Sequence, residues 1–267
     1  MWCKPQAFNS TCFVMHTLKF SKGNAKLSKR LIFNLPAGYT CPNAGLCRTM
    51  ADKDTGKITD APRTDHATGN EFRCFAAMAE VRPAVRAARW HNYHAVQATL
   101  ADAIGDPVDE LAGVIAWNMQ LNNRNSHIKL CRIHESGDFY SAQYLQAWIK
   151  VASGHRDMKF YAYTKQLQLW LDHYAFMPNN FYLTASLGGD QDYLIQRYPH
   201  IFQRVAQVVY TEDEAGCLDL EIDHDDSHCF GVKPFALLVH NNQRKGSEAA
   251  KALAARRRQG SWTGYKY

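Results

Sequence analysis

IKLCRIHESGDFYSAQYLQAWIKVAS, residues 128–153, is the stretch that decides the fold. Its first part, 128–134, is a short apolar run that predicts a buried strand. The polar, glycine-containing residues that follow predict a loop. The last part, 140–153, predicts an amphipathic helix, whose apolar face is formed by Tyr144, Leu145, Trp148, Ile149 and Ala152.

The same strand–loop–helix unit recurs along the rest of the chain. A spacing of about 25 residues per unit is typical of parallel sheets with helical crossovers. Five or six such units fall short of a closed eight-stranded barrel, so we expect an α/β fold with a partial (β/α) barrel. A doubly wound open sheet is the alternative, although the chain has no glycine-rich dinucleotide turn. The further strands are predicted at 158–164, 181–187, 205–211 and 235–240, and the further helices at 165–176, 190–198 and 246–257.

The first half of the chain is organised differently. Residues 1–75 contain many turn signals and predict an irregular segment, with one strand at Arg30–Leu35 and an exposed loop at 52–70. Residues 76–125 predict two helices, of which the first is interrupted at Pro83. With the repeats at 126–258, we expect one domain over residues 1–267.

Composition limits the class of protein. The chain has 267 residues, a formal charge of +6 and 46% hydrophobic residues, as expected of a globular domain. No run of about 18 apolar residues and no signal-peptide pattern is present, so we expect a cytoplasmic protein without a membrane span. Structural disulfides are rare there, so the eight cysteines are expected to be buried thiols or metal ligands.

Three cysteines of the N-terminal part, Cys41, Cys47 and Cys74, have the spacing C-x5-C-x26-C. Thiolates bind zinc or iron–sulfur clusters. A zinc ribbon needs paired C-x2-C knuckles, which the chain lacks, so the open spacing favours a [4Fe-4S] cluster. Unpaired reduced thiols are the alternative.

The segment 221–231, EIDHDDSHCFG, is a second polar cluster. Its Cys229 is a candidate fourth ligand. Its His224, Asp225 and Asp226 are candidates to bind a divalent metal or to anchor a loop. Cys131 and Cys217 are expected to be buried rather than ligating, and we assign no role to the remaining cysteines, Cys3 and Cys12.

Polar residues follow the predicted strands at the edge where (β/α) folds place their active sites. We expect a pocket lined by His134, Glu135, Asp138, Lys165 and Ser186. Gly137, Gly188 and Gly189 would let backbone approach a ligand closely. Helix capping is the alternative role for several of these residues.

The C-terminal tail combines basic and aromatic residues. Arg256, Arg257 and Arg258 precede Trp262, Tyr265 and Tyr267, and Lys22, Lys26, Lys29 and Arg30 add charge near the N-terminus. Such residues can bind phosphates and stack on bases. The alternative is a solvated helix end, where arginine complements the helix dipole.

Several segments together resemble a bacteriophage family, the gene product 88-like proteins. They are FSKGNAKLSKRLIFNLPAGYTCPNAGLC, FRCFAA, IHESGDFYSAQYLQAWIKVA, FYAYTK, LTASLGG, EIDHDDSHC and FALLVHNNQRKGS. The resemblance extends over about residues 20–255. It implies a phage-encoded protein made in the host cytoplasm.

The arrangement is also similar to radical S-adenosylmethionine enzymes, which have a partial barrel and an N-terminal cysteine-bound [4Fe-4S] cluster. This resemblance implies that three thiolates leave one iron open for S-adenosylmethionine. The chain lacks the C-x3-C-x2-C motif of those enzymes, and Cys41, Cys47 and Cys74 would hold the cluster at a different spacing.

The leading hypothesis is therefore a phage iron–sulfur protein on a radical-SAM-like partial barrel. An open iron would allow an enzyme acting on an unknown small molecule, whereas a fourth thiolate would favour a structural or electron-carrying cluster. The first alternative is a nucleic-acid-associated accessory protein with a structural metal site. The second is a zinc hydrolase using His134, Asp138 and residues 224–228.

Overall fold

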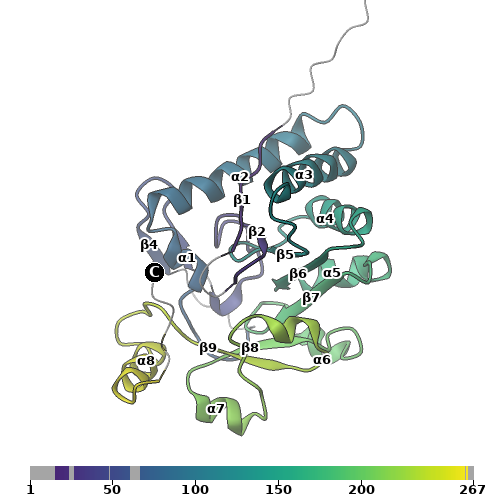
Figure 1. Ribbon diagram of the computed structural model, residues 1–267. Helices are drawn as coiled ribbons and strands as arrows, with labels where there is room; N and C mark the ends of the chain where they lie inside the picture. The colour runs from purple at the N-terminus through teal and green to yellow at the C-terminus, as the bar shows by residue number, and fades with distance from the viewer. Residues whose placement is uncertain (1–15, 24–26, 48, 61–66, 262, 264–267) are drawn as a thin grey trace, which may run out of the picture.

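A computed structural model of the chain describes residues 16–23, 27–47, 49–60, 67–261 and 263 (Figure 1). Its centre is a seven-stranded, mostly parallel sheet, with a separate two-stranded hairpin. The large sheet has the order β1(Phe20–Ser21), β2(Leu31–Phe33), β5(Leu130–Ile133), β6(Lys159–Thr164), β7(Phe181–Ser186), β8(Val205–Val209) and β9(Phe235–Leu238), and the hairpin joins β3(Thr49–Ala51) to β4(Ile58–Asp60).

Strands β2 and β5 to β9 are parallel and lie side by side in chain order, and β1 joins the β2 edge antiparallel. A doubly wound sheet reverses direction at a switch point. No such reversal occurs among the described strands, so this sheet is wound in one direction only.

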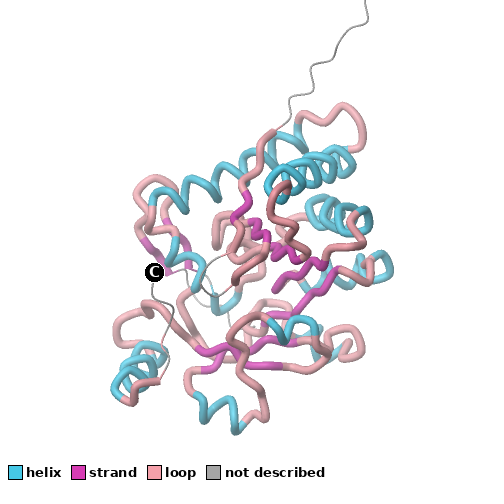
Figure 2. Tube along the Cα trace, viewed as in Figure 1, coloured by secondary structure: helices cyan, strands magenta, loops and turns pink. Residues whose placement is uncertain are grey.

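Helices follow most strands and cover the sheet (Figures 1 and 2). In Figure 1, α3 to α6 lie along one side, while α1 and the segment that bears Cys41 and Cys47 lie on the other. The helices are α1(Phe75–Ala79), α2(Pro83–Ala101), α3(Pro107–Asn123), α4(Ala142–Gly154), α5(Leu167–His173), α6(Tyr193–Arg197), α7(Glu212–Cys217) and α8(Glu248–Arg258), with short 3-10 helices η1(Gly45–Cys47), η2(Tyr174–Phe176) and η3(Ser227–Phe230).

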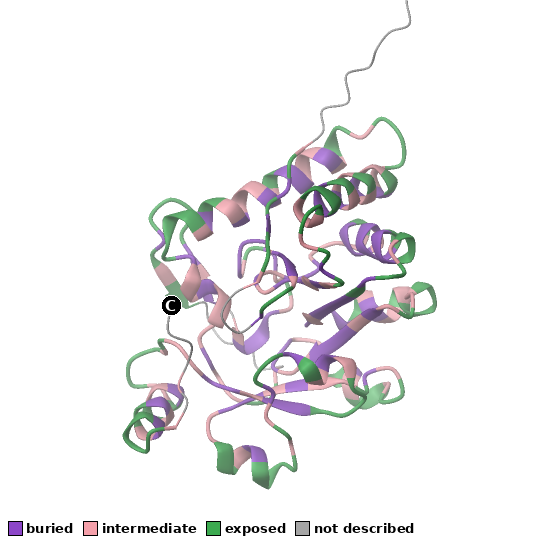
Figure 3. Ribbon diagram, viewed as in Figure 1, coloured by how far each residue is buried: buried purple, intermediate pink, exposed green. Residues whose placement is uncertain are grey.

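The main core lies between the sheet and its helices, where the buried residues of Figure 3 concentrate. Trp148 of α4 is fully buried against Phe33 of β2, with ring centroids 5.4 Å apart. On β5, Cys131 and Ile133 point into this core because alternate residues of a strand face the same side. Arg132 consequently faces the opposite side of the sheet, whereas His134, just past the end of β5 and at positive φ, packs its ring against Phe139 and Tyr144 on the core side.

The structure confirms the predicted strands and helices of the later part of the chain to within a few residues, but the N-terminal part has more than the one predicted strand, because Phe20–Ser21 pairs with β2. Pro83 begins a new helix, α2, as the expected interruption requires. The segment 52–70 is not wholly a loop, because Ile58–Asp60 pairs with Thr49–Ala51 as a hairpin. No helix in the described ranges is long and apolar enough to cross a membrane.

Candidate functional site

One large cavity, of about 590 Å³, lies on the side of the sheet that faces α1 and α2. Alanine-rich faces of α1 and α2 form its opposite wall, including Ala76, Ala79 and Ala88. Its volume is in the range of small-molecule sites. Each parallel strand contributes a lining residue: Ile32, Arg132, Tyr163, Ser186, Val208 and Leu237.

Cys41, Cys47 and Cys74 all line this cavity, although they are widely separated in the sequence. A hydrogen bond between the thiols of Cys47 and Cys74 raises the pKa of Cys47 and lowers that of Cys74 to about 7. Backbone N–H groups of Ala76 and Ala77, in the first turn of α1, also favour the Cys74 thiolate. Burial, with the neighbouring charges of Asp138 and Cys74, raises the pKa of Cys41.

The three thiols differ from a single-ion site. Among the described residues, no group of three or more His, Cys, Asp or Glu side chains is arranged to hold one metal ion. Cys47 and Cys74 are in hydrogen-bond contact with each other. Three soft donors around one cavity suit zinc or an iron–sulfur cluster by chemistry.

The loop that bears Cys41 is tied to α1 by Glu80. The Glu80 side chain is fully buried, and its Oε1 accepts hydrogen bonds from the backbone N–H of Ala37 at 2.8 Å and from Arg89 Nη1 at 2.9 Å. The Ser136 hydroxyl approaches the same oxygen at 3.4 Å. One carboxylate thus joins the cysteine loop, the helix and the loop after β5.

The loop that bears Cys47 rests on the glycine pair after β7. Leu46 N–H donates to the carbonyl of Gly188 at 2.8 Å, and a Cβ on Gly45 would lie only 2.2 Å from that oxygen. Asp192 accepts from the N–H groups of Gly188 and Gly189. These glycines therefore allow close approach of the chain's own cysteine loop, as does Gly137, whose Cβ would meet Thr40 at 2.7 Å.

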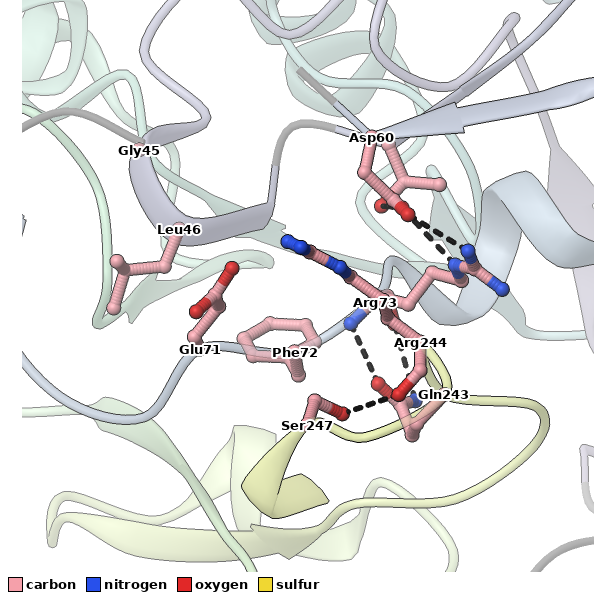
Figure 4. Close-up of a pocket in the computed structure, with 10 residues that line it drawn as sticks. Gly45, Leu46, Asp60, Glu71, Phe72, Arg73, Gln243, Arg244 and Ser247 are labelled. Atoms are coloured by element: carbon pink, nitrogen blue, oxygen red, sulfur yellow. Dashed lines mark hydrogen bonds and ion pairs between the residues drawn. The ribbon is translucent and has the colours of Figure 1, made fainter. Parts of the chain in front are cut away.

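The segment before Cys74 is held from outside the cavity, beside a small pocket of about 30 Å³ (Figure 4). The Arg73 guanidinium donates to both oxygens of Asp60, at 3.0 and 2.7 Å. Arg73 N–H donates to Gln243 Oε1 at 2.6 Å, and Cys74 N–H to Thr49 Oγ1 at 3.1 Å. The β3–β4 hairpin and the loop between β9 and α8 together fix the position of Cys74.

The five expected pocket residues, His134, Glu135, Asp138, Lys165 and Ser186, all line the cavity. Asp138 is buried and bonded to the Thr164 hydroxyl and to Lys165 N–H, so it links the loop after β5 to β6. Burial raises the pKa of Asp138 and lowers that of Lys165. Lys165 Nζ donates to the carbonyls of Ser186 at 2.9 Å and Leu187 at 2.6 Å, and its charge acts on Cys47 and Cys74.

The structure does not bring Cys229 to the other three thiols. It is fully buried beside Tyr161, Ala206 and Phe235, and it is not among the residues that line the cavity. Burial raises its pKa to about 12. Cys131 is buried as predicted, but the prediction for Cys217 was wrong, because it is exposed. Cys3 and Cys12 lie outside the described residues.

In the polar cluster 221–231, Asp226 anchors the loop, which is one of the two roles predicted for it from the sequence. Asp226, 1% exposed, receives hydrogen bonds from Arg132 Nη1 and from the Tyr161 hydroxyl, and Arg30 lies 3.7 Å away. Asp225 instead accepts from Ser227 N–H at the surface. Arg132 and Tyr163 also line the cavity, but they were not selected from the sequence. They alternate with core residues along β5 and β6, and this alternation could have indicated that they face the side of the sheet opposite the core.

The basic tail is less available than the sequence suggests. Arg256 is buried, donates to the Val239 carbonyl and pairs with Glu212, so only Arg257 and Arg258 are exposed. Lys22 and Lys29 are exposed, whereas Arg30 is partly buried near Asp226. Lys26, Trp262, Tyr265 and Tyr267 lie outside the described residues.

Comparison with known proteins gives the family. A protein-family model with the description Gene product 88 matches residues 18–260 of this chain. The chain belongs to this phage family. It is 37% identical over 148 residues to the Gene 88 protein of Mycobacterium phage L5, and 36% identical over 148 residues to that of phage D29. These alignments cover 54% of this chain and 51% and 50% of the two relatives, so the match spans about half their length. No solved structure matches the chain, and nothing in the comparisons supports the similarity to radical S-adenosylmethionine enzymes.

Proposed function

We propose that this phage protein holds a [4Fe-4S] cluster through Cys41, Cys47 and Cys74, inside a partial (β/α) barrel. The observation that carries the proposal is the convergence of three thiols, from positions 41, 47 and 74, on one cavity lined by all six parallel strands. Hydrogen bonds to the surrounding structure hold the segments that bear these three thiols in place.

The chain's own residues suit this role. Lys165 places a buried ammonium beside Cys47 and Cys74, which compensates the negative charge of thiolates. The first turn of α1 presents N–H groups to Cys74. When bound, the cluster would supply one-electron transfer or a Lewis-acidic iron.

An open coordination position favours an enzyme over a structural cluster. Among the described cysteines, only these three line the cavity, and Cys229 lies apart from them. Three cysteines would hold such a cluster with one iron left without a thiolate. Binding of S-adenosylmethionine there stays a prediction from the resemblance, as does location in the host cytoplasm.

The test is purification of the full chain without oxygen, followed by an absorption spectrum and assays of iron and sulfide. We expect a broad band near about 400 nm and matched iron and sulfide. Cys41→Ala, Cys47→Ala and Cys74→Ala should each lose most of the iron. Cys217→Ala, at an exposed thiol, and Cys229→Ala should retain it. A colourless wild type after reconstitution with iron and sulfide would refute the proposal.

A further inference from the structure

Cys47 and Cys74 are the two cavity thiols that contact each other directly. Their side chains share a hydrogen bond, and both are half-buried, so neither is sealed from solvent. Two cysteine side chains whose sulfur atoms already lie in contact are close enough to be joined by a disulfide. The cavity beside them, of about 590 Å³, has the volume of a small-molecule site, so a small oxidant can reach the sulfur atoms.

The thiol of Cys41 has different contacts. Among the described residues, its hydrogen bonds are with the backbone of Gly38 and the side chain of Thr40, within its own turn. It acts on Cys47 through charge, as Cys74 acts on it, and no hydrogen bond joins it to either thiol in the described part of the chain. Of the three thiols, Cys47 and Cys74 are therefore the pair in place to couple.

The backbone around this pair is already tied together. Cys74 N–H donates to the hydroxyl of Thr49, two residues after Cys47, at 3.1 Å. Leu46 N–H donates to the carbonyl of Gly188 at 2.8 Å, which fixes the other side of Cys47. A bond between the two sulfur atoms would join segments that the fold already holds side by side, so the surrounding secondary structure can remain in place.

We infer that Cys47 and Cys74 are a site of reversible disulfide formation in the metal-free protein. The oxidant is a small disulfide such as oxidised glutathione. One cysteine thiolate attacks a sulfur atom of this oxidant, which forms a mixed disulfide and releases the first glutathione. The second cysteine attacks the mixed disulfide, which forms the Cys47–Cys74 bond and releases the second glutathione. The two electrons and two protons of the cysteine thiols leave with the two glutathione thiols.

The disulfide and a bound metal exclude each other, and this part of the inference rests on the proposed function. Thiolates are the cysteine ligands of iron and zinc. Oxidation removes two of the three thiolates, and Cys41 alone cannot hold a cluster. Disulfides in reducing compartments are mostly transient, catalytic or redox-sensing, which agrees with a bond that forms only while the site is empty.

The experiment treats the metal-free full chain with oxidised glutathione, alkylates the remaining thiols, and maps tryptic peptides by mass spectrometry without a reducing agent. We expect the loss of two free thiols and a cross-link between peptides 31–48 and 74–86. Fragment ions of this pair distinguish Cys41 from Cys47, which share the first peptide. Dithiothreitol should remove the cross-link. A wild type that yields only glutathione adducts, or a cross-link through Cys41, would overturn the inference.

Variants provide a second assignment of the bond. Cys41→Ala should form the same cross-link, whereas Cys47→Ala and Cys74→Ala should lose it and carry a glutathione adduct on the remaining thiol. Cys217→Ala, at an exposed thiol, is the matched control and should behave as wild type. A thermal melt verifies that each variant folds. A cross-link of unchanged yield in Cys47→Ala would contradict the assignment.

The rate of cross-linking tests the competition with metal. Protein reconstituted with iron and sulfide, and freed of excess reagents without oxygen, should cross-link at least about tenfold more slowly than metal-free protein, because thiolates bound to iron are not free to attack. Equal rates would refute the competition. A cross-link in a protein that never binds iron would refute only the cluster, and a loaded cluster without any cross-link after its removal would refute only the disulfide, so the two proposals fail separately.

Discussion

Replacing Glu80 by glutamine should destabilise the protein more than any surface substitution. Glu80 has a fully buried side chain, and Arg89, its partner at 2.9 Å, is 5% exposed. Glutamine keeps the shape but removes the charge, which leaves a buried guanidinium without its counterion. Removing one partner of a buried pair costs roughly 3–5 kcal/mol.

The geometry places the expected cost at the lower end, about 3 kcal/mol. The hydrogen bonds from Ala37 N–H and from Arg89 Nη1 both end on Glu80 Oε1, whereas Glu80 Oε2 has no partner among the described residues. A glutamine can keep its carbonyl oxygen at the Oε1 position and its amide group at the other. Glu80→Gln would then keep these hydrogen bonds and lose mainly the electrostatic attraction to Arg89.

Urea unfolding of wild type, Glu80→Gln and Glu248→Gln measures this difference. Glu248 is a matched control, because it forms an exposed pair with Lys251, 70% and 65% accessible, and should change stability by less than about 0.5 kcal/mol. A further double variant, Glu80→Gln with Arg89→Met, should recover part of the loss. If Glu80→Gln unfolds within about 1 kcal/mol of wild type, this carboxylate does not anchor the cysteine loop as argued.

Three further predictions concern the same region. Gly45→Ala should destabilise the protein by at least about 1–2 kcal/mol and reduce iron retention, because its φ is 54° and its Cβ would meet Gly188 O at 2.2 Å; Gly113→Ala, at an open helix position, should be neutral or stabilising in the same melts. Lys165→Met should lower the reduction potential of the reconstituted cluster by roughly 60 mV, the equivalent of one charge-assisted contact, and an unchanged potential in a redox titration would show that its charge does not reach the cluster. Because the pKa of His134 is about 3 when folded, against about 6.5 unfolded, its contribution to stability is present above pH 6.5 and falls as the pH is lowered; unfolding at pH 5 should show a loss of about 2 kcal/mol that His134→Asn lacks.

The repeated units were predictable because their signals are local. Apolar runs, helix periodicity and polar loops lie within each unit, so 128–153 alone indicates β5 and α4. Sequential strand order follows from the same rhythm, since short crossovers place consecutive strands side by side. The β3–β4 hairpin was missed because its strands are three residues each and carry polar side chains.

Long-range placement was predictable only in part. Sequence singled out Cys41, Cys47 and Cys74 for their chemistry, and the expected pocket residues for their positions after strands. Nothing local shows that Cys229 lies beside Tyr161 instead, because that depends on how η3 packs against the strands. Cys217 was expected to be buried, but its helix, α7, exposes it.

The glycines show why residue type alone could not separate a ligand site from its scaffold. Gly188 and Gly189 were selected as places where backbone could approach a ligand closely, and in the structure the groups that come near them are Leu46 and Asn43 of the chain's own cysteine loop. A glycine in a loop indicates that another group approaches closely, but it does not show whether that group belongs to the chain itself or to a ligand.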